Sequence, residues 1–236
     1  MQPDSTNLIH MAGIQNPLIG FYDAPEPSAF EPLVEPAPGQ RTCVFAYYNR
    51  WLKGETLHIT NNFGCRGARH WLCDTAMGSR DDFVRFLVDE EGLKSSRGLM
   101  NQWLDRHRPY QQEYPHLLIG PLREGQYKYL KSVTFYVNPD QLGLLMLGAQ
   151  YSRTPDDPSP VIAPFGSGCM QLVTLFEDLS LPQALVGATD IAMRQHLPPD
   201  ILAFTVTQAM FEELCGLDEQ SFLHKPFWQR LRKARR

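Results

Sequence analysis

Proline is the residue that most limits the fold of this chain, because 19 of its 236 residues are prolines. Each proline fixes φ and lacks a backbone N–H, so it ends or kinks a helix and interrupts a central strand. Many of the prolines fall into two clusters, at 25–38 and 155–164. We therefore expect short helices and strands joined by long connections. Neither cluster is flexible enough in composition to define a domain boundary.

The composition is that of an ordinary globular protein, with 43% hydrophobic, 20% charged and 11% aromatic residues. It excludes a disordered, fibrous or coiled-coil chain, and the length allows one large domain with its own core. We therefore expect residues 1–236 to form a single domain. The five cysteines are an odd number, and the chain has no signal-peptide pattern and no 18-residue apolar run. These features predict a cytoplasmic protein with reduced thiols and no membrane span.

The charge is unevenly distributed along the chain. Residues 221–236 hold six of the 22 basic side chains and none of the 26 acidic ones, so the remainder carries 16 basic against 26 acidic side chains, a formal charge of −10. Such a body has no reason to bind nucleic acid.

Residues 222–236 form a basic amphipathic segment, in which Leu223, Phe227, Trp228 and Leu231 share one helical face. One interpretation is that this face docks on the body and leaves a basic end free. The alternative is that the segment binds a membrane surface, RNA or a partner protein.

Hydrophobic periodicity and capping residues predict an α+β fold, a mixed sheet with packed helices. The first strands form a hairpin through a turn at 53–55, and Leu57 and Ile59 face the core. Ser79 caps a helix and Asn138 caps another that begins with proline. The expected strands are 42–51, 56–60, 132–137 and 203–207, with an extended stretch at 160–165; the expected helices are 65–74, 81–91, 99–106, 139–150, 169–179 and 208–215.

Three short segments recur in the same order along the chain. Residues 21–25 are echoed by 135–139, 46–50 by 149–153, and the Phe-Gly-Cys run at 63–65 by the run at 165–169. One interpretation is a degenerate duplication with repeats at about 17–130 and 131–215. Pseudo-twofold packing would then bring the two Gly-Cys turns together. The other interpretation is chance similarity of short segments.

The two Gly-Cys turns are the candidate site. Glycine permits a tight turn or a close approach to a ligand, and a following helix offers unpaired N–H groups to an anion or a thiolate. A cysteine at a helix N-terminus has a lowered pKa, and Arg66 and Arg69 would lower that of Cys65 further. The alternative is that glycine and cysteine are simply small residues that allow close packing. The candidate ligand-binding residues are Tyr48, His58, Gly64, Cys65, Arg66, Gly67, Arg69, Gly166, Ser167, Gly168 and Cys169.

Other chemistry has weaker support. Cys65 and Cys73 on one helix would lie about 12 Å apart, too far to share a metal ion with His70. An iron–sulfur cluster that uses Cys43 and Cys169 with these two cysteines stays open, although the spacing does not favour it.

The run from Gly64 to Ala68 resembles a nucleophile elbow with cysteine in place of serine. Its candidate bases are His58 and His70, and the groups that would orient them are Asp74 and Asp190. The alternatives are structural roles without chemistry. His58 suits the solvent face of a strand, and Tyr48 lies in an aromatic run of the kind that half-exposed strands favour.

Several of these segments together resemble the DUF169 family, also labelled ArCR. They are the runs 43–47, 54–55, 64–68, 166–169 and 190–194, followed by Leu-Pro-Pro at 197–199. The resemblance covers residues 15–215 and excludes the basic segment. It implies a soluble protein of prokaryotic type whose most distinctive features are the Gly-Cys turns, and it implies no reaction.

The leading hypothesis is a protein that binds a small anionic ligand or cofactor at the two turns. The runner-up is a thiol-dependent or iron–sulfur redox protein that uses the same cysteines. A third is a non-catalytic interaction protein that uses its basic C-terminal segment. The sequence identifies neither the ligand, nor a cofactor, nor the oligomeric state, and it leaves open whether the protein is an enzyme.

Overall fold

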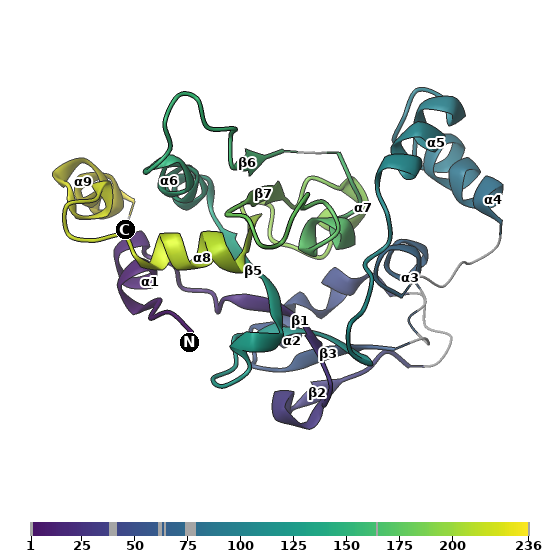
Figure 1. Cartoon of the computed structure of the whole chain (residues 1–236), viewed down its shortest axis with the longest axis horizontal. Helices are drawn as coiled ribbons and strands as arrows, with labels where there is room; N and C mark the ends of the chain where they lie inside the picture. Colours follow the sequence, from purple (N-terminus) through teal and green to yellow (C-terminus); the bar gives the residue numbers. More distant parts are fainter. Residues whose placement is uncertain are drawn as a thin grey trace.

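The computed structural model describes residues 2–37, 42–60, 63, 65–73, 79–163 and 165–235. Within these residues, one mixed sheet runs through the molecule in the strand order β2-β3-β4-β1-β5-β8-β7-β6 (Figure 1). The strands are β1 (Ile19–Ala24), β2 (Leu33–Val34), β3 (Thr56–Ile59), β4 (His116–Pro121), β5 (Leu130–Val137), β6 (Val161–Ile162), β7 (Ala184–Gly187) and β8 (Leu202–Thr207).

Helices cover both faces of this sheet. One face packs against α1 (Thr6–Ala12), α6 (Pro139–Gln150) and α8 (Gln208–Cys215), which gather on the left of Figure 1. The other face packs against the short helices η2 (Val44–Tyr47), α2 (Tyr48–Trp51), α3 (Arg66–Cys73), α4 (Arg80–Arg85), η3 (Phe86–Glu90), α5 (Arg97–Arg106), η5 (Gly168–Leu172) and α7 (Ile191–Arg194).

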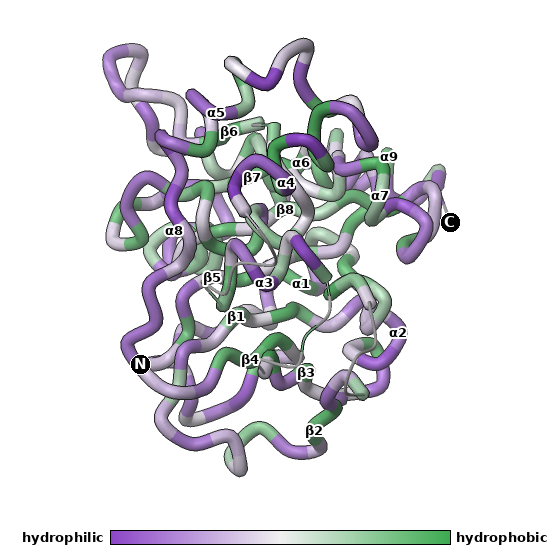
Figure 2. Tube along the Cα trace, turned by 90° about the vertical axis from the view of Figure 1, so that its right-hand side faces the viewer, coloured by the Kyte–Doolittle hydropathy of each residue, from purple (hydrophilic) through white to green (hydrophobic). Residues whose placement is uncertain are grey.

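The central strands are buried on both sides, as expected for a sheet between two helical layers. Every residue of β1 is buried; Phe21 faces one cluster of apolar side chains and Tyr22 the other. Figure 2 shows the same pattern, with hydrophobic segments along the inner strands and hydrophilic ones in the outer loops.

The sheet consists of two halves with the same strand order. From the centre to the edge, the first half reads β1-β4-β3-β2 and the second reads β5-β8-β7-β6. In each half the first two pairings are antiparallel and the edge pairing is parallel, and β1 and β5 meet antiparallel at the centre. The duplication itself stays a proposal, which this symmetric order supports.

The strand order pairs each segment of the first half with an equivalent segment of the second half. Only one of the three sequence echoes agrees with this pairing. Residues 21–25 and 135–139 do fall at the ends of β1 and β5. The Gly-Cys turns do not correspond: Cys65 follows β3, whereas Cys169 precedes β7. The residue that follows β7 and precedes a helix, as Cys65 follows β3 and precedes α3, is Asp190.

The α+β fold class and most predicted elements are confirmed. The caps are as expected: the Ser79 side chain accepts from the N–H of Asp82, and Asn138 and Gln141 form a reciprocal capping box. The alternation in β3 also holds, since Leu57 and Ile59 belong to the buried cluster on the α3 side.

Two predicted elements are wrong. The expected strand at 42–51 is a pair of short helices, η2 and α2, so the hairpin with β3 does not form; β3 pairs instead with β2 and β4. Aromatic residues favour strands, but here they pack as helical side chains: Tyr48 and Trp51 both contact the ring of Tyr136. The expected helix at 169–179 is only the 3₁₀ turn η5 (Gly168–Leu172), which ends at Val173 because this residue adopts a non-helical conformation.

The predicted basic segment contains the turn η6 (Phe222–His224) and helix α9 (Pro226–Ala234). It lies against α1, because the indole N–H of Trp228 and a guanidinium N–H of Arg232 both donate to the carbonyl of Met11, at 2.6 and 3.1 Å. Phe227 on the same helix is 81% exposed. The segment therefore docks only part of its apolar surface.

Across the described ranges, no helix is both long and apolar enough to span a bilayer.

A candidate thiol site in a cleft between two turns

A cleft of about 530 Å³ lies where the two cysteine-bearing turns meet. Its walls come from the start of η2, the first turn of α3, the turn η3, the start of η5, and α7. The residues that line it are Thr42, Cys43, Val44, Cys65, Arg66, Gly67, Trp71, Phe83, Phe86, Leu87, Glu90, Glu91, Ser167, Gly168, Cys169, Asp190, Ala192, Met193, Gln195 and His196.

Cys65 is held in the cleft as a stabilised thiolate. It immediately precedes α3, where the backbone N–H groups of Gly67 and Ala68 have no partner within the helix and point at its sulfur. The thiol of Cys43 also donates to it. The hydrogen bond from Cys43, followed by those from the two N–H groups, lowers the pKa of Cys65 to about 6 despite burial and the nearby charge of Asp190.

Cys43 is the donor of this pair. It lies just before η2, and its hydrogen bond to Cys65, together with burial, raises the pKa of Cys43 well above that of an ordinary thiol. In this pair the hydrogen bond favours the charged form of Cys65 and the neutral form of Cys43.

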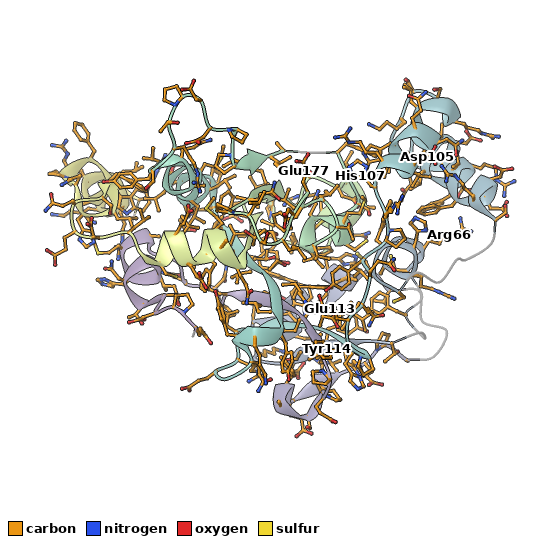
Figure 3. All side chains as sticks on the ribbon, in the orientation of Figure 1. Arg66, Asp105, His107, Glu113, Tyr114 and Glu177 are labelled. Atoms are coloured by element: carbon orange, nitrogen blue, oxygen red, sulfur yellow. The ribbon has the colours of Figure 1, made fainter. Side chains whose placement is uncertain are left out.

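Arg66 and Arg69, which were expected to stabilise the thiolate, are not among the groups that lower the pKa of Cys65. The guanidinium of Arg66 lies 4.8 Å from the centre of the Phe86 ring, between α3 and α4 (Figure 3). Arg69 lies on the next turn of α3 and acts on Cys73, whose pKa burial nevertheless raises to about 11. Backbone N–H groups and a second cysteine, not the two arginines, are the main groups that stabilise the charge of Cys65.

The second turn approaches the first at Gly67. A Cβ atom at this position would lie 3.3 Å from the sulfur of Cys169, 3.7 Å from the hydroxyl of Ser167 and 3.9 Å from the sulfur of Cys65. A side chain at position 67 would therefore press on Cys169, and glycine lets the two turns come this close without that contact. Cys169 is buried, and burial together with the charge of Cys65 raises its pKa. It is a neutral thiol beside the thiolate.

Two side chains hold the second turn in place: Asp190, which caps α7, and Gln171, which is buried. The carboxylate of Asp190 accepts from the N–H groups of Gly168 and Ala192, both at 2.9 Å. The amide of Gln171, 2% exposed, donates to Thr189 and accepts from the N–H of Ala188. Asp190 thus ties η5 to α7, as the Cys43–Cys65 hydrogen bond ties η2 to α3.

Glu91 supplies a titratable group at the rim of the cleft. Burial and the negative charges of Asp190, Cys65 and Glu90 raise the pKa of Glu91 to about 7. A carboxyl with this pKa can donate or accept a proton near neutral pH. It follows η3, a π-helical turn, and such turns often occur at functional sites.

The structure brings together six of the predicted site residues, Cys65, Arg66, Gly67, Ser167, Gly168 and Cys169. Gly64 lies outside the described residues, and so does Asp74. Tyr48, His58, Arg69 and Gly166 are not among the residues that line the cleft. Tyr48 is buried against Tyr136, with ring centres 5.0 Å apart.

The bases expected for the nucleophile elbow do not line the cleft. The elbow itself, predicted at Gly64 to Ala68, falls partly outside the described residues, since Gly64 is not among them. His58 lies elsewhere on β3, where its ring nitrogens contact Glu35 at 2.6 Å and His116 at 3.1 Å. His70 stacks with Phe83, with ring centres 4.7 Å apart.

A search of the described residues finds no group of three or more histidines, cysteines, aspartates or glutamates that is arranged to hold a metal ion.

Sequence reasoning did not identify Glu90 and Glu91 as site residues, and it treated Cys43 only as a candidate cluster ligand. No local pattern marks them, because they reach the cleft from segments that are 22 or more residues from Cys65 in sequence and that only tertiary packing brings there.

The fold and the cleft define a class of protein: an α+β protein with a sheet between two helical layers and a thiolate in a cleft between its two halves. The chain belongs to the DUF169 family, described as uncharacterised ArCR, whose family model matches residues 14–216. Comparisons with curated proteins and with solved structures gave no significant match. The match ends before η6 and α9, so the basic segment lies outside the family region.

Proposed function

We propose that this protein is a thiol-dependent redox protein in which Cys65 attacks a small disulfide bound in the cleft and Cys43 completes the reaction. The observation that carries the proposal is the hydrogen bond from the thiol of Cys43 to a Cys65 thiolate that is also stabilised by two backbone N–H groups. A thiolate is the nucleophilic form of cysteine, and a neighbouring thiol can act as the resolving group.

The first step forms a mixed disulfide. The Cys65 thiolate attacks one sulfur of the substrate RS–SR, a bond forms between Cys65 and that sulfur, and the RS–SR bond breaks to release RS⁻. A pKa of about 6 means that most of the Cys65 population is already ionised at neutral pH. No separate base is needed for this step.

The second step uses Cys43. Once Cys65 is in a mixed disulfide it no longer carries a charge, so the largest cause of the raised pKa of Cys43 is removed. Cys43 passes its proton to the released RS⁻, attacks the Cys65 sulfur and releases the second RS⁻, which takes a proton from water. The two cysteines are oxidised to one disulfide, and the substrate is reduced by two electrons to two thiols.

The leading alternative from the sequence, an anionic ligand held at the two helix starts, has less support in this cleft. Only the first turn is followed by an α-helix, α3, since the second is followed by the short 3₁₀ turn η5. The free N–H groups at the start of α3, those of Gly67 and Ala68, already face the Cys65 thiolate. Three carboxylates, those of Glu90, Glu91 and Asp190, also line the cleft. An anion would compete with the thiolate and meet these charges.

The reaction is tested with bis(2-hydroxyethyl) disulfide, a small neutral disulfide, and mass mapping of the products. We expect a Cys43–Cys65 disulfide in the parent protein, and a trapped mixed disulfide on Cys65 in Cys43→Ser. Cys215 on α8, outside the cleft, serves as the internal reference because burial raises its pKa to about 12. Modification of Cys65 no faster than that of Cys215, or the absence of a Cys43–Cys65 linkage, would refute the proposed function.

A further inference from the structure

Acidic side chains outnumber basic ones among the described residues that line the cleft of the proposed reaction site. Glu90, Glu91 and Asp190 line the cleft, and its basic lining residues are Arg66 and His196. Arg66 is already placed over the Phe86 ring. When the Cys65 thiolate is counted, negative charge exceeds positive charge in the cleft.

The two glutamates differ from two other acidic residues on the same helical stretch. Asp82 and Asp89 form ion pairs with Arg85 and Arg97. Within the described part of the chain, Glu90 and Glu91 form no ion pair. Among the described residues, no ion pair therefore offsets their negative charges, and a bound cation would favour the ionised form of Glu91, whose pKa is about 7.

The negative groups converge closely enough to influence one another. The charges of Asp190, Cys65 and Glu90 all act on Glu91 and contribute to its raised pKa. Asp190 has part of its charge satisfied by the N–H groups of Gly168 and Ala192, whereas Glu91 is exposed at the rim. A positive ligand group at this rim would relieve the repulsion.

Part of the cleft lining is apolar. It includes Trp71, Phe83, Phe86 and Leu87, and apolar walls strengthen electrostatic interactions by excluding water. The cleft therefore combines a volume of about 530 Å³, an apolar wall and a negatively charged rim.

From this arrangement we infer that the cleft selects small organic cations, and that its substrate is a disulfide bearing ammonium groups, the class of the aminothiol disulfides. The choice of a disulfide rests on the proposed function, whereas the choice of a cation rests on the cleft carboxylates alone. In the complex, the ammonium group lies at the glutamate rim while a substrate sulfur reaches Cys65.

Three disulfides of similar size and different charge test the inference. They are cystamine, which is dicationic, bis(2-hydroxyethyl) disulfide, which is neutral, and 3,3′-dithiodipropionate, which is dianionic. The measurement is the rate at which Cys65 is modified, divided by the rate for a small neutral thiol under the same conditions. We expect cystamine to exceed the dianion by about tenfold or more at low salt, a preference that declines at high ionic strength.

Charge-neutral variants identify the groups responsible. The double variant Glu90→Gln with Glu91→Gln should lose most of the preference for cystamine over the dianion. Glu124→Gln is the matched control, since it removes one carboxylate from an exposed turn outside the cleft and should leave the preference unchanged.

A binding measurement separates this inference from the proposed function. In Cys65→Ser the nucleophile is removed but the carboxylates remain, so cystamine should still raise the Tm and dithiodipropionate should not. Rapid modification of Cys65 with no preference among the three disulfides would overturn the cation inference and leave the thiol function intact. A cystamine-dependent Tm shift with an unreactive Cys65 would overturn the thiol function and leave the cation site intact. The absence of both would overturn the two together.

Discussion

The replacement of Cys43 by alanine is the sharpest test of how the reactive thiolate is made. The thiol of Cys43 is the largest single cause of the lowered pKa of Cys65. Alanine removes this donor and leaves the N–H groups of Gly67 and Ala68 in place. Serine at the same position keeps a hydroxyl donor, so Cys43→Ser is the matched control.

The size of the effect follows from the energy of one hydrogen bond to a charged group, about 1.5–3 kcal/mol. One pKa unit corresponds to about 1.4 kcal/mol, so the loss raises the pKa of Cys65 by about one to two units. The starting value is about 6. We therefore expect a value of about 7–8 in Cys43→Ala, and a rate of thiolate alkylation at pH 7 that falls about two- to tenfold.

The assay is the rate of Cys65 alkylation by iodoacetamide from pH 4.5 to 9.5, followed by peptide mass spectrometry. The midpoint of the profile is compared, not the plateau, because a less acidic thiol forms a more nucleophilic thiolate. The parent and Cys43→Ser should share a midpoint near the parent value of about 6. An unshifted midpoint in Cys43→Ala would show that Cys43 does not stabilise the thiolate. A parent midpoint near 8.5, the value of a free cysteine, would refute the reasoning altogether.

Three further predictions concern stability, measured by urea or thermal unfolding. Gly168→Ala should lower the free energy of unfolding by about 1–3 kcal/mol, because the added Cβ overlaps side chains of η2 and α7. The control Gly143→Ala should not lower it, because no atom lies within 4 Å of the added Cβ. Equal effects of the two substitutions would contradict the packing at the second turn. The folded-state pKa of Glu91 lies above its ordinary value of 4.5, so its ionisation destabilises the fold as the pH rises toward about 7. The Tm of Glu91→Gln relative to the parent should therefore increase between pH 5 and pH 8. A difference that stays constant with pH would exclude this titration. Trp228→Ala should lower the free energy of unfolding by about 1–3 kcal/mol, because it removes packing and the hydrogen bond to α1. Phe227→Ala, at an 81% exposed position, should change that free energy by less than about 0.5 kcal/mol. Similar losses in the two variants would show that α9 docks by another face.

Much of the helical structure could be predicted because its signals are local. The helix from Pro139 begins where Asn138 and Gln141 cap each other, three residues apart. The helix that begins after Ser79 is marked in the same way. Local signals failed at 42–51, because an aromatic run suits a strand and a buried short helix equally well. They failed again after Cys169, because nothing in sequence shows that the chain leaves the helical conformation at Val173.

The candidate site could be predicted in part. The two Gly-Cys turns were expected to meet if the halves pack about a pseudo-twofold axis, and they do meet at Gly67. The internal echo, however, paired Cys65 with Cys169, whereas the sheet order places Asp190 at the position equivalent to Cys65. Two segments can therefore resemble each other in sequence and still lie at non-equivalent positions in the two halves of the sheet.

The sequence by itself determined the proline-limited element lengths, the helix caps and the two cysteines that follow glycine. Each of these depends on backbone geometry or on hydrogen bonds between residues a few positions apart. Only the tertiary structure decided which groups act on Cys65. Its proton partner Cys43 lies on η2, the neutral thiol of Cys169 on η5, and the carboxylate of Glu91 after η3. A pKa depends on the donors and charges within a few ångströms, and those neighbours are set by how distant segments pack on the sheet.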